Sequence, residues 1–568
     1  MKKILLRLMF LAMLVALLPV HVAQACSAFI VGKDLTADGS TLFGRTEDYP
    51  YAPDGGRHNQ NYVVVPAKTY KDGDKIEDES NGFTYPHLAN EMKYTAVYDS
   101  DRDNGSNGNF AAHGFNELGV AMTATVSATP NDKVLKEDPL VKDGLPEASL
   151  VDLALPRAKT AREVIETVAK VLDEKGSAEG NIIVAADKNE LWYMEILSGH
   201  QYVAIKFPTN KYAVFANTYY LGHVDLNDKE NVIASKDVEE VAKKADNYKT
   251  DKDGNFMIAK SYGPDKYMER NRSRTYAGIK WMDPQAKVNY DDEAFDLLRE
   301  PTDPNKKYTV HDVIAEQRNR FEHLPEYKAD DLVEVGKKID GNVYKYALGN
   351  ENVIDAHVYQ IKPNLPNAFG GVMWLGLAQS RNTPYVPFYG NVEDTYEAFK
   401  NRSTKYDGKS WYWTVWHIDQ MVMKYPEIFG NSIQEKWKAK EAEWDKEQTE
   451  RDAKYANYTD EQAKAAGPEV TKEALERSEK IFKEIKAVEA EMEEKIKKEK
   501  GKDADLVYTG YNKANLLAEA EKGKSADKAS DTKKDSSSQT TWIVIGVLVV
   551  LVAGFFGYKQ FNKKKEEE

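Results

Sequence analysis

Cysteine is almost absent from this sequence, since its 568 residues contain only one, Cys26. A single thiol cannot form an internal disulfide, so burial and hydrogen bonding have to stabilise the fold, and the thiol is incidental, an anchor or a reagent. A basic excess is also absent, because the formal net charge is −14. Phosphates need cations to neutralise them, so we expect no nucleic-acid partner.

Apolar and aromatic residues, by contrast, are plentiful. Hydrophobic residues make up 41% of the chain, which includes 33 Tyr and 9 Trp, and this is ample for a large packed core. The length allows more than one domain, because domains usually run to about 100–200 residues.

The first 25 residues are predicted to be a signal peptide. Met1-Lys2-Lys3 is a short basic region, and the stretch from Ile4 to Val20 is mostly apolar. Ala23-Gln24-Ala25 is the small-x-small pattern that signal peptidase accepts, so we expect cleavage between Ala25 and Cys26. The alternative is an N-terminal membrane anchor that is not cleaved.

A second apolar run lies near the other end of the chain. Residues 542–558 carry no charge and are just long enough to span a bilayer. The lysines of the basic tail at 559–568 place that end in the cytoplasm and could also bind anionic lipid. Residues 506–541 read as a polar linker, which makes a buried core helix the less favoured alternative. We therefore expect a single-pass membrane protein with its main domain outside the cell.

The region from residue 26 to about 220 has the pattern of short strands separated by turns. A helix is predicted after the capping box Thr160-Ala161-Arg162-Glu163, and Gly176 ends it. Strands in meanders with a helix between them favour a layered α+β domain, which we place at residues 26–430. The strands are predicted at 27–31, 40–45, 62–65, 119–127, 181–186, 191–196, 202–207 and 212–217.

Residues 431–505 form a charged helical segment with one apolar stripe, which includes Leu475, Phe482, Ile485 and Met492. Two interpretations compete: a helical hairpin packed on the preceding domain, and a stalk or coiled coil. We favour the hairpin, because the stripe is too short for several heptads.

Cleavage after Ala25 would leave Cys26 with both a thiol and a free α-amine. An α-amine titrates near about 7.7–8.0, so it can accept the thiol proton at neutral pH. The thiolate can then attack an amide carbonyl and form a thioester. In that case maturation is also activation. The alternatives are a lipid-modified lipoprotein cysteine and a buried bystander.

The residues after Cys26 sharpen this hypothesis. The stretch Cys26 to Lys33, followed by Asp38 to Asp48, resembles the start of the PepD-type dipeptidase family, which are cysteine N-terminal-nucleophile hydrolases. Further similar stretches follow in the same order over about 200 residues. They are 115–125, 138–141, 186–195, 199–200 and 215–217, with thinner similarity at 373–375 and 385–389.

The resemblance implies a four-layer αββα sandwich in which Cys26 begins a central strand. It also implies roles for four other residues. Arg45 would favour the thiolate, and Asp48, placed beside it on a turn, would orient the α-amine. Asn217 would stabilise the oxyanion, and Arg274 resembles a late catalytic arginine of the wider superfamily.

Other polar residues carry weaker signals. The second oxyanion asparagine of bile-salt and penicillin acylases has no counterpart, because that region reads Thr125-Val126-Ser127. His113 and His200 have no metal partners at ligand spacing, so we expect no zinc site. The acidic run 99–105 fails to match a calcium loop. Trp192 and Glu195 are expected in the core.

We therefore predict an extracytoplasmic, membrane-anchored cysteine peptidase that hydrolyses dipeptides or short peptides and needs no cofactor. The first alternative is an acylase of the same superfamily that acts on a non-peptide amide. The second is a non-catalytic surface binding protein that displays its main domain on a helical stalk. An unmodified Cys26 as the first residue of the mature chain would separate the enzyme from the binding protein.

Overall fold

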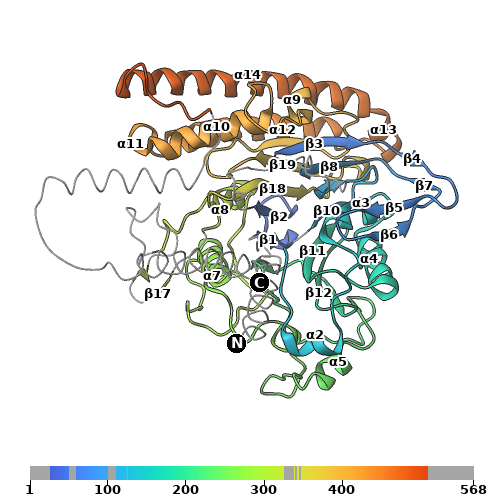
Figure 1. The fold of residues 1–568 in the computed structure, drawn as a ribbon. Helices are drawn as coiled ribbons and strands as arrows, with labels where there is room; N and C mark the ends of the chain where they lie inside the picture. Colours follow the sequence, from blue (N-terminus) through green and yellow to red (C-terminus); the bar gives the residue numbers. More distant parts are fainter. Residues whose placement is uncertain are drawn as a thin grey trace, which may run out of the picture. The chain divides into compact units, whose positions relative to one another are not determined.

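Two antiparallel β-sheets form the centre of the computed structural model (Figure 1). It describes residues 26–49, 59–99, 110–124, 126–324 and 347–508, together with the short strands at 338–339 and 342–343. The strands of the six-stranded sheet are, in order, β14 (Tyr212–Phe215), β1 (Ser27–Val31), β2 (Thr41–Asp48), β18 (Val353–Ile361), β19 (Val372–Leu377) and β20 (Val386–Tyr389). The strands of the eight-stranded sheet are, in order, β15 (Val232–Ala234), β13 (Tyr202–Lys206), β12 (Leu191–Ile196), β11 (Asn181–Ala186), β10 (Ala121–Ala124), β9 (Ala111–Phe115), β8 (Tyr94–Asp99) and β3 (Gln60–Val65).

Short strand pairs and helices surround the two sheets. The pairs are β4 (Lys68–Thr69) with β7 (Asn90–Glu91), β5 (Lys75–Asp78) with β6 (Phe83–Pro86), and β16 (Lys338–Ile339) with β17 (Asn342–Val343). The helices are α2 (Asp132–Glu137), α3 (Leu150–Ala154), α4 (Ala161–Lys175), α5 (Val238–Lys244), α6 (Ile258–Tyr262), α7 (Glu269–Met282), α8 (Val310–Gln317), α9 (Glu397–Lys400), α10 (Trp411–Lys424), α11 (Pro426–Phe429), α12 (Ser432–Tyr455), α13 (Asp460–Ala465) and α14 (Gly467–Lys500). The described residues also form the 3₁₀ turns η1 (Lys33–Leu35), η2 (Glu147–Ser149) and η4 (Asn367–Phe369).

Local sequence explains where several of these elements begin and end. The side chain of Thr160 accepts a hydrogen bond from the backbone N–H of Glu163, and Gly176 adopts φ +73° after the last turn of α4. These are the start and stop signals that the capping box and the glycine predict. In β2, a Cβ on Gly44 would lie 2.0 Å from the carbonyl oxygen of His357. Only glycine therefore allows β2 and β18 to approach so closely at this point.

The two sheets face each other across the main apolar core. Arg45 of β2 bonds Thr123 of β10, and the ring of Phe115 on β9 packs edge-on against Tyr359 of β18. Helices α3 and α4 cover the other face of the eight-stranded sheet, where a second apolar cluster lies. Helices α7, α8, α10 and α12 contact strands of the six-stranded sheet. The α+β class expected from the sequence is confirmed.

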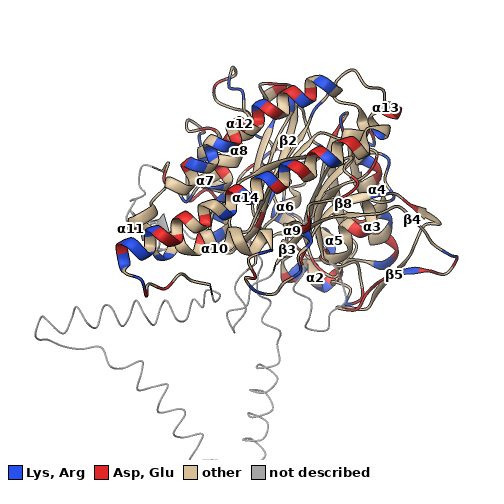
Figure 2. Ribbon diagram, turned by 90° about the horizontal axis from the view of Figure 1, so that it is seen from above, with Lys and Arg blue, Asp and Glu red and all other residues tan. Residues whose placement is uncertain are grey.

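The helices near the C-terminal end of the described chain pack against the sheets and do not extend as a stalk. Arg318, just after α8, donates hydrogen bonds of 2.9 and 2.6 Å to the two carboxylate oxygens of Glu441 on α12. His417 on α10 bonds Glu489 on α14 at 2.7 Å. Acidic and basic residues alternate along α12 and α14 (Figure 2). The structure therefore agrees with the packed-hairpin interpretation.

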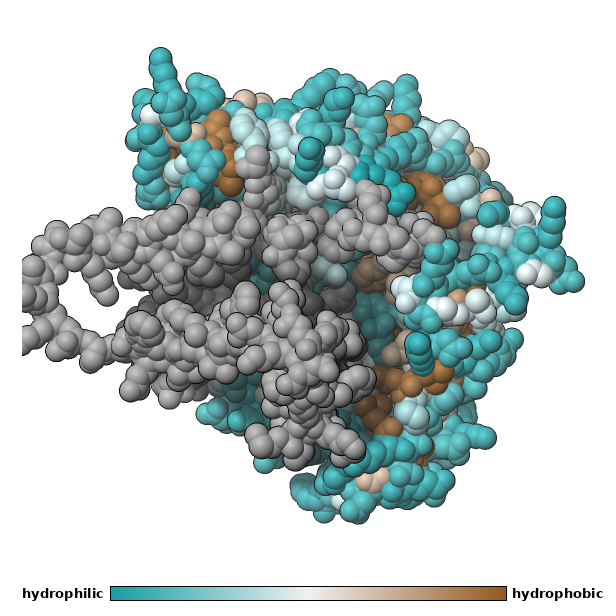
Figure 3. Space-filling model, viewed as in Figure 1, coloured by the Kyte–Doolittle hydropathy of each residue, from teal (hydrophilic) through white to brown (hydrophobic). Residues whose placement is uncertain are grey.

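Burial is nearly complete for large apolar side chains in the described ranges. Figure 3 shows a mainly hydrophilic surface on the face it presents, with scattered hydrophobic residues. Among the described residues, the large hydrophobic side chains that remain exposed are Leu88, Leu118, Met268, Leu298 and Tyr508. Such isolated exposed residues are normal for a folded protein and mark no binding surface by themselves.

Three predicted segments lie outside the described residues. They are the signal peptide at 1–25, the apolar run at 542–558 and the basic tail at 559–568, and most of the linker at 506–541 lies outside as well. Within the described part of the chain, the helices are all too short or too polar to cross a bilayer.

Candidate active site

Cys26 lies directly before β1, which runs between β14 and β2 near one side of the six-stranded sheet. Its side chain is fully buried, and Arg45 Nη1 donates a hydrogen bond of 3.3 Å to Sγ. Burial raises the pKa of the Cys26 thiol to about 12, while the positive charge of Arg45 opposes that rise. The thiol therefore needs both its arginine and a base before it can act as a nucleophile at neutral pH.

The guanidinium of Arg45 is held on several sides. Nε donates to the hydroxyl of Thr123 at 3.0 Å, and Nη2 donates to the carbonyl of Ala124 at 2.8 Å. Nη2 also pairs with Oε2 of Glu47 at 3.0 Å. Because the guanidinium is planar, these partners fix the direction of Nη1 toward Cys26. Arg45 lies where the sequence predicted it, beside the thiol.

Asp48 ends β2 and is fully buried. Its Oδ2 accepts a hydrogen bond of 2.8 Å from Asn350, whereas Oδ1 has no hydrogen-bond partner among the described residues. Burial raises the pKa of this carboxyl to about 7, and Arg274 opposes the rise. The turn expected between Arg45 and Asp48 is wrong, because β2 continues through Asp48 as a strand. Favourable pairing with β18 extends the strand, with a register shift between Val353 and Asp355.

Asn217 follows β14 by two residues and is held by α7. Arg274 Nη2 donates to its Oδ1 at 2.9 Å, and Asn271 Nδ2 donates to its backbone carbonyl at 2.6 Å. The Nδ2 group of Asn217 is buried and has no hydrogen-bond acceptor within the described ranges. A buried, fixed and unpaired amide N–H is what oxyanion stabilisation requires.

Arg274 connects these parts of the site. Its Nη1 donates to the carbonyl oxygen of Cys26 and, at 3.1 Å, to the hydroxyl of Ser27. Its Nη2 bonds Asn217 and also Asn271 at 2.9 Å. Direct hydrogen bonds therefore link four of the predicted site residues, Cys26, Arg45, Asn217 and Arg274. Asp48 lies close enough for the charges of Arg274 and Arg45 to act on its carboxyl.

A second set of buried residues contacts Arg45 through Thr123, and the sequence analysis did not predict it. His357 Nε2 lies 2.9 Å from the hydroxyl of Thr123, and its Nδ1 lies 2.9 Å from Asp355. The ring of His113 stacks on that of His357, with centroids 3.6 Å apart. Burial, together with the charge of His113, lowers the pKa of His357 to about 3, so its imidazole is neutral. The neutral ring donates from Nδ1 to Asp355 and accepts at Nε2 from Thr123.

Among the described residues, two groups of side chains have donor atoms close enough to hold a metal ion. His113, Asp355 and His357 form one group, and His417, Glu489 and Glu493 form the other. The expectation that His113 lacks partners at ligand spacing is therefore wrong, because they come from distant β18. Hydrogen bonds already engage these groups, as at His113 Nδ1, which lies 2.7 Å from the hydroxyl of Tyr359.

Other residues considered from the sequence have structural contacts. His200 Nδ1 lies 2.9 Å from Asp138. Glu195 is buried and accepts hydrogen bonds from the backbone N–H groups of Tyr220 and Leu221, so it holds the loop that follows Asn217. Trp192 is buried on the opposite face of the same strand, as expected for a core residue.

The segment that replaces the acylase asparagine is only partly described. Ser127 donates its hydroxyl to Glu147 at 3.0 Å, so this hydroxyl is engaged. Val126 is buried and pairs through its backbone with Ile182. Residue 125 lies outside the described ranges, as does most of the acidic run 99–105. Neither described side chain offers a second oxyanion donor.

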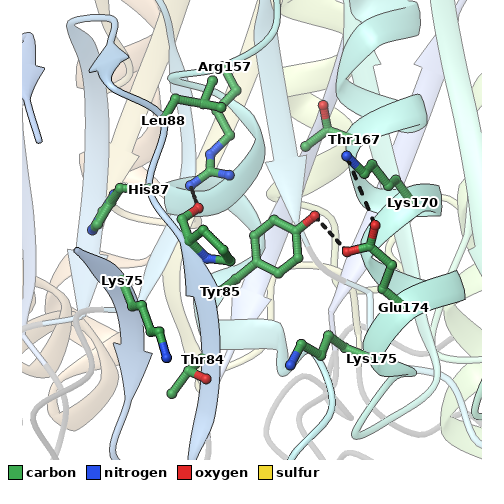
Figure 4. Close-up of a pocket in the computed structure, with 11 residues that line it drawn as sticks. Lys75, Thr84, Tyr85, His87, Leu88, Arg157, Thr167, Lys170, Glu174 and Lys175 are labelled. Atoms are coloured by element: carbon green, nitrogen blue, oxygen red, sulfur yellow. Dashed lines mark hydrogen bonds and ion pairs between the residues drawn. The ribbon is translucent and has the colours of Figure 1, made fainter. Parts of the chain in front are cut away.

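A pocket of about 600 Å³ opens elsewhere, between the β5–β6 hairpin and α4 (Figure 4). In it, the hydroxyl of Tyr85 bonds Glu174 at 3.0 Å, and the guanidinium of Arg157 bonds the carbonyl of Pro86 at 2.9 Å. None of the five predicted site residues lines this pocket. It is therefore separate from the thiol site.

The chain was compared with family models, with curated proteins and with solved structures. The family model "Peptidase family C69" matches residues 25–478, a range that extends through α12 and into α14. The chain is 48% identical to "Probable dipeptidase B" of Streptococcus pyogenes serotype M1 over 84% of this chain and 95% of that protein. It is 33% identical to "Probable dipeptidase" of Latilactobacillus sakei over 69% of this chain and 79% of that protein. A solved structure, a conjugated bile acid hydrolase mutant from Clostridium perfringens, aligns with TM-score 0.23 and 14% identity over 62% of this chain and 89% of that one.

Proposed function

The chain belongs to peptidase family C69, and on this premise we propose that it is a cysteine dipeptidase whose nucleophile is Cys26. One observation carries the assignment of the nucleophile: the chain's only thiol lies 3.3 Å from a fixed arginine nitrogen. The buried and unpaired amide of Asn217 supports the same reaction. We also propose that the layers described above are the αββα sandwich of N-terminal-nucleophile hydrolases, which the helix contacts on both sheets support.

The reaction begins once cleavage after Ala25 has freed the α-amine of Cys26. This amine takes the thiol proton, and Sγ attacks the carbonyl carbon of the substrate's first residue. The carbonyl oxygen becomes an oxyanion, which the Nδ2–H of Asn217 stabilises. The peptide C–N bond then breaks, and the α-ammonium returns its proton to the departing amino group. Water hydrolyses the remaining thioester, which releases the first amino acid and restores the thiol.

The other residues of the site position these groups. Arg45 keeps positive charge beside the sulfur as the thiolate forms. Asp48 has a carboxylate oxygen without a partner in the described structure, and it would accept a hydrogen bond from the α-amine. Arg274 holds both the carbonyl of Cys26 and the amide of Asn217, so it fixes the distance between nucleophile and oxyanion donor.

We propose further that the protein acts outside the cell, anchored in the membrane through the apolar run at 542–558. The signal pattern before Cys26, the uncharged apolar run and the lysines after it support this location. Dipeptides or short peptides would then be met in the extracellular space. Mass spectrometry of the mature N-terminus and protease digestion of intact cells would test it. An unprocessed N-terminus, or a domain protected from external protease, would contradict it.

Release of amino acids from a panel of dipeptides tests the activity itself. The mature protein, with Cys26 confirmed by mass as its first residue, is compared with Cys26→Ala. Because the chain has one cysteine, stoichiometric alkylation provides a second, independent block of the same group. Turnover that both treatments abolish supports the proposal. Hydrolysis of only non-peptide amides would favour an acylase, and no hydrolysis at all would favour a binding protein.

A further inference from the structure

Glu47 is a buried carboxylate that the reaction above does not use. It lies in β2, and 1% of its surface is exposed. Its Oε2 accepts a hydrogen bond of 3.0 Å from Arg45 Nη2, while its buried Oε1 has no hydrogen-bond partner among the described residues. Leaving a buried carboxylate oxygen unpaired is costly, so such an atom needs an explanation.

Glu47 is also a neighbour of the nucleophile. The two terminal nitrogens of one guanidinium bond Cys26 Sγ and Glu47 Oε2, at 3.3 and 3.0 Å. Because those nitrogens belong to the same rigid plane, the thiol and the carboxylate are held side by side. A substrate carbonyl that Sγ attacks must therefore lie close to Glu47 as well.

Negative groups outnumber positive ones around this carboxylate. Burial raises the pKa of Glu47 to about 8, Arg45 lowers it, and the charges of Asp355, Glu147 and Asp99 raise it further. Arg45 donates hydrogen bonds to the thiol and to Thr123 as well as to Glu47, so its charge is shared among them. A positively charged group brought in by the substrate would thus be stabilised at Glu47.

In a dipeptide, the α-ammonium is separated from the first carbonyl carbon by a single Cα, which is two covalent bonds of about 1.5 Å each. Attack by Sγ on that carbonyl therefore places the ammonium within a few ångströms of the sulfur. At that distance the carboxylate of Glu47 can bind it. An internal peptide bond has no cation at this position. The geometry thus links the position of the scissile bond to the free N-terminus.

We propose that Glu47 binds the α-ammonium of the substrate through Oε1 and thereby restricts the enzyme to the first peptide bond of substrates with a free N-terminus. This inference rests on the proposed dipeptidase function and adds a residue that selects the substrate. A purely structural role would be to neutralise Arg45. The two roles differ in their consequences, because only the first distinguishes charged from uncharged N-termini.

The test compares alanyl-alanine with propionyl-alanine, which has the same acyl skeleton without the ammonium. Wild-type kcat/KM should favour alanyl-alanine by roughly 10–100-fold at pH 7, the effect of one buried charge-assisted hydrogen bond. With a pKa of about 8, Glu47 is largely protonated in the empty site at pH 7, and a bound ammonium would draw it into the carboxylate form. Glu47→Gln keeps an acceptor for Arg45 but cannot ionise. In this variant the ratio of kcat/KM for alanyl-alanine to that for propionyl-alanine should fall at least about tenfold, mostly because KM for alanyl-alanine rises. An equal loss on both substrates would overturn the proposal.

Glu147→Gln is the matched control. Glu147 is also buried, and its charge also raises the pKa of Cys26, but its Oε2 already accepts from Ser127 at 3.0 Å. The control should keep the wild-type preference. A preference that is lost in Glu147→Gln and kept in Glu47→Gln would transfer the role to Glu147 and refute the inference.

A second measurement does not depend on turnover. Cys26 is the chain's one thiol, so the rate of thiol alkylation by iodoacetamide, followed by mass at Cys26, reports occupation of the site. Alaninamide should protect wild-type Cys26 at concentrations at least about tenfold below those at which propionamide protects it, and Glu47→Gln should abolish this difference. Equal protection by the two amides in wild type would overturn the inference even if dipeptides are hydrolysed. A clear difference would support it even if the true substrates are other free amines.

Discussion

Arg274 donates a hydrogen bond of 2.9 Å to Oδ1 of Asn217. Because arginine has only donors, this bond identifies the amide oxygen of Asn217 and therefore also its nitrogen. The Nδ2–H group consequently faces away from Arg274, where it is buried without a partner in the described structure. The same Arg274 side chain binds the carbonyl of Cys26. One residue of α7 thus orients the oxyanion donor relative to the nucleophile.

Asn217→Ala should lower kcat by about 10²–10³-fold and change KM little, because the lost bond forms mainly in the transition state. Steady-state kinetics on a good dipeptide measure both constants. Asn131→Ala is the control, since Asn131 caps α2 and bonds the carbonyl of Ser261 at 2.9 Å. A variant with raised KM and unchanged kcat would show that Asn217 binds the substrate in its ground state instead.

Arg45→Lys should slow alkylation of Cys26 at pH 7 and move the apparent pKa of the thiol upward. A lysine keeps the charge but cannot bond Thr123, Ala124, Glu47 and the sulfur together from one rigid group. The rate of iodoacetamide labelling against pH gives the thiol pKa directly. Arg162→Lys, a change on the exposed side of α4, should leave the profile unchanged. An unaltered profile in Arg45→Lys would mean that charge alone is sufficient.

Glu316→Gln should stabilise the protein at alkaline pH. Burial raises the pKa of the Glu316 carboxyl to about 8. The folded state therefore holds this proton more tightly than the unfolded chain, so the free energy of unfolding falls as pH rises from about 4 to about 8. Removing the acid should leave stability near pH 4 unchanged and raise it above pH 8 by on the order of 5 kcal/mol.

Urea unfolding at several pH values measures this difference. Glu476→Gln, an exposed position on α14, should show little difference from wild type at any pH. A stabilisation of Glu316→Gln that does not depend on pH would refute the titration argument and point to packing.

Glu441→Ala should destabilise the fold by about 3–5 kcal/mol, because it leaves the buried charge of Arg318 without its partner. Glu441 also accepts a hydrogen bond of 2.9 Å from the backbone N–H of Tyr385, so α12 loses two attachments. Thermal unfolding measures the effect. Glu441→Gln keeps one acceptor oxygen, so its loss of stability should lie between those of wild type and Glu441→Ala. Glu476→Ala should leave the stability almost unchanged. A small effect in Glu441→Ala would show that α12 contributes little to the domain.

The regular elements near the N-terminal half could be predicted because their signals are local. The strands expected at 181–186 and 191–196 have those bounds in β11 and β12, and α4 begins and ends at its capping residues. The strand expected at 119–127 is shorter, since β10 covers only Ala121–Ala124. The strand expected at 40–45 is longer, because pairing with β18 carries β2 to Asp48. Where a strand ends thus depends on the neighbouring strand it pairs with, which can be distant in sequence.

The candidate site divides in the same way. Cys26 was found from the cleavage signal before it, whereas Arg45 and Asp48 were identified by the family resemblance of the stretch that follows. Asn217 and Arg274 also needed the family resemblance, and they lie far along the chain from Cys26, where no local pattern marks them. His357 and Asp355 could not be found at all, since β18 reaches Arg45 only through the pairing of the folded sheet. Glu47 stood within the recognised stretch, but only its burial and its unpaired oxygen distinguish it from an ordinary strand residue.

The bond between Asn350 and Asp48 joins residues 302 positions apart. A chain made at about 5–20 residues per second takes about 15–60 s to cover that interval. During that time β2 has no β18 to pair with, and the thiol has no complete set of neighbours. Cys26 is made early, but it gains these neighbours only after residue 350 has been made. A chain truncated before residue 350 would contain the cysteine but would lack the residues that complete its site.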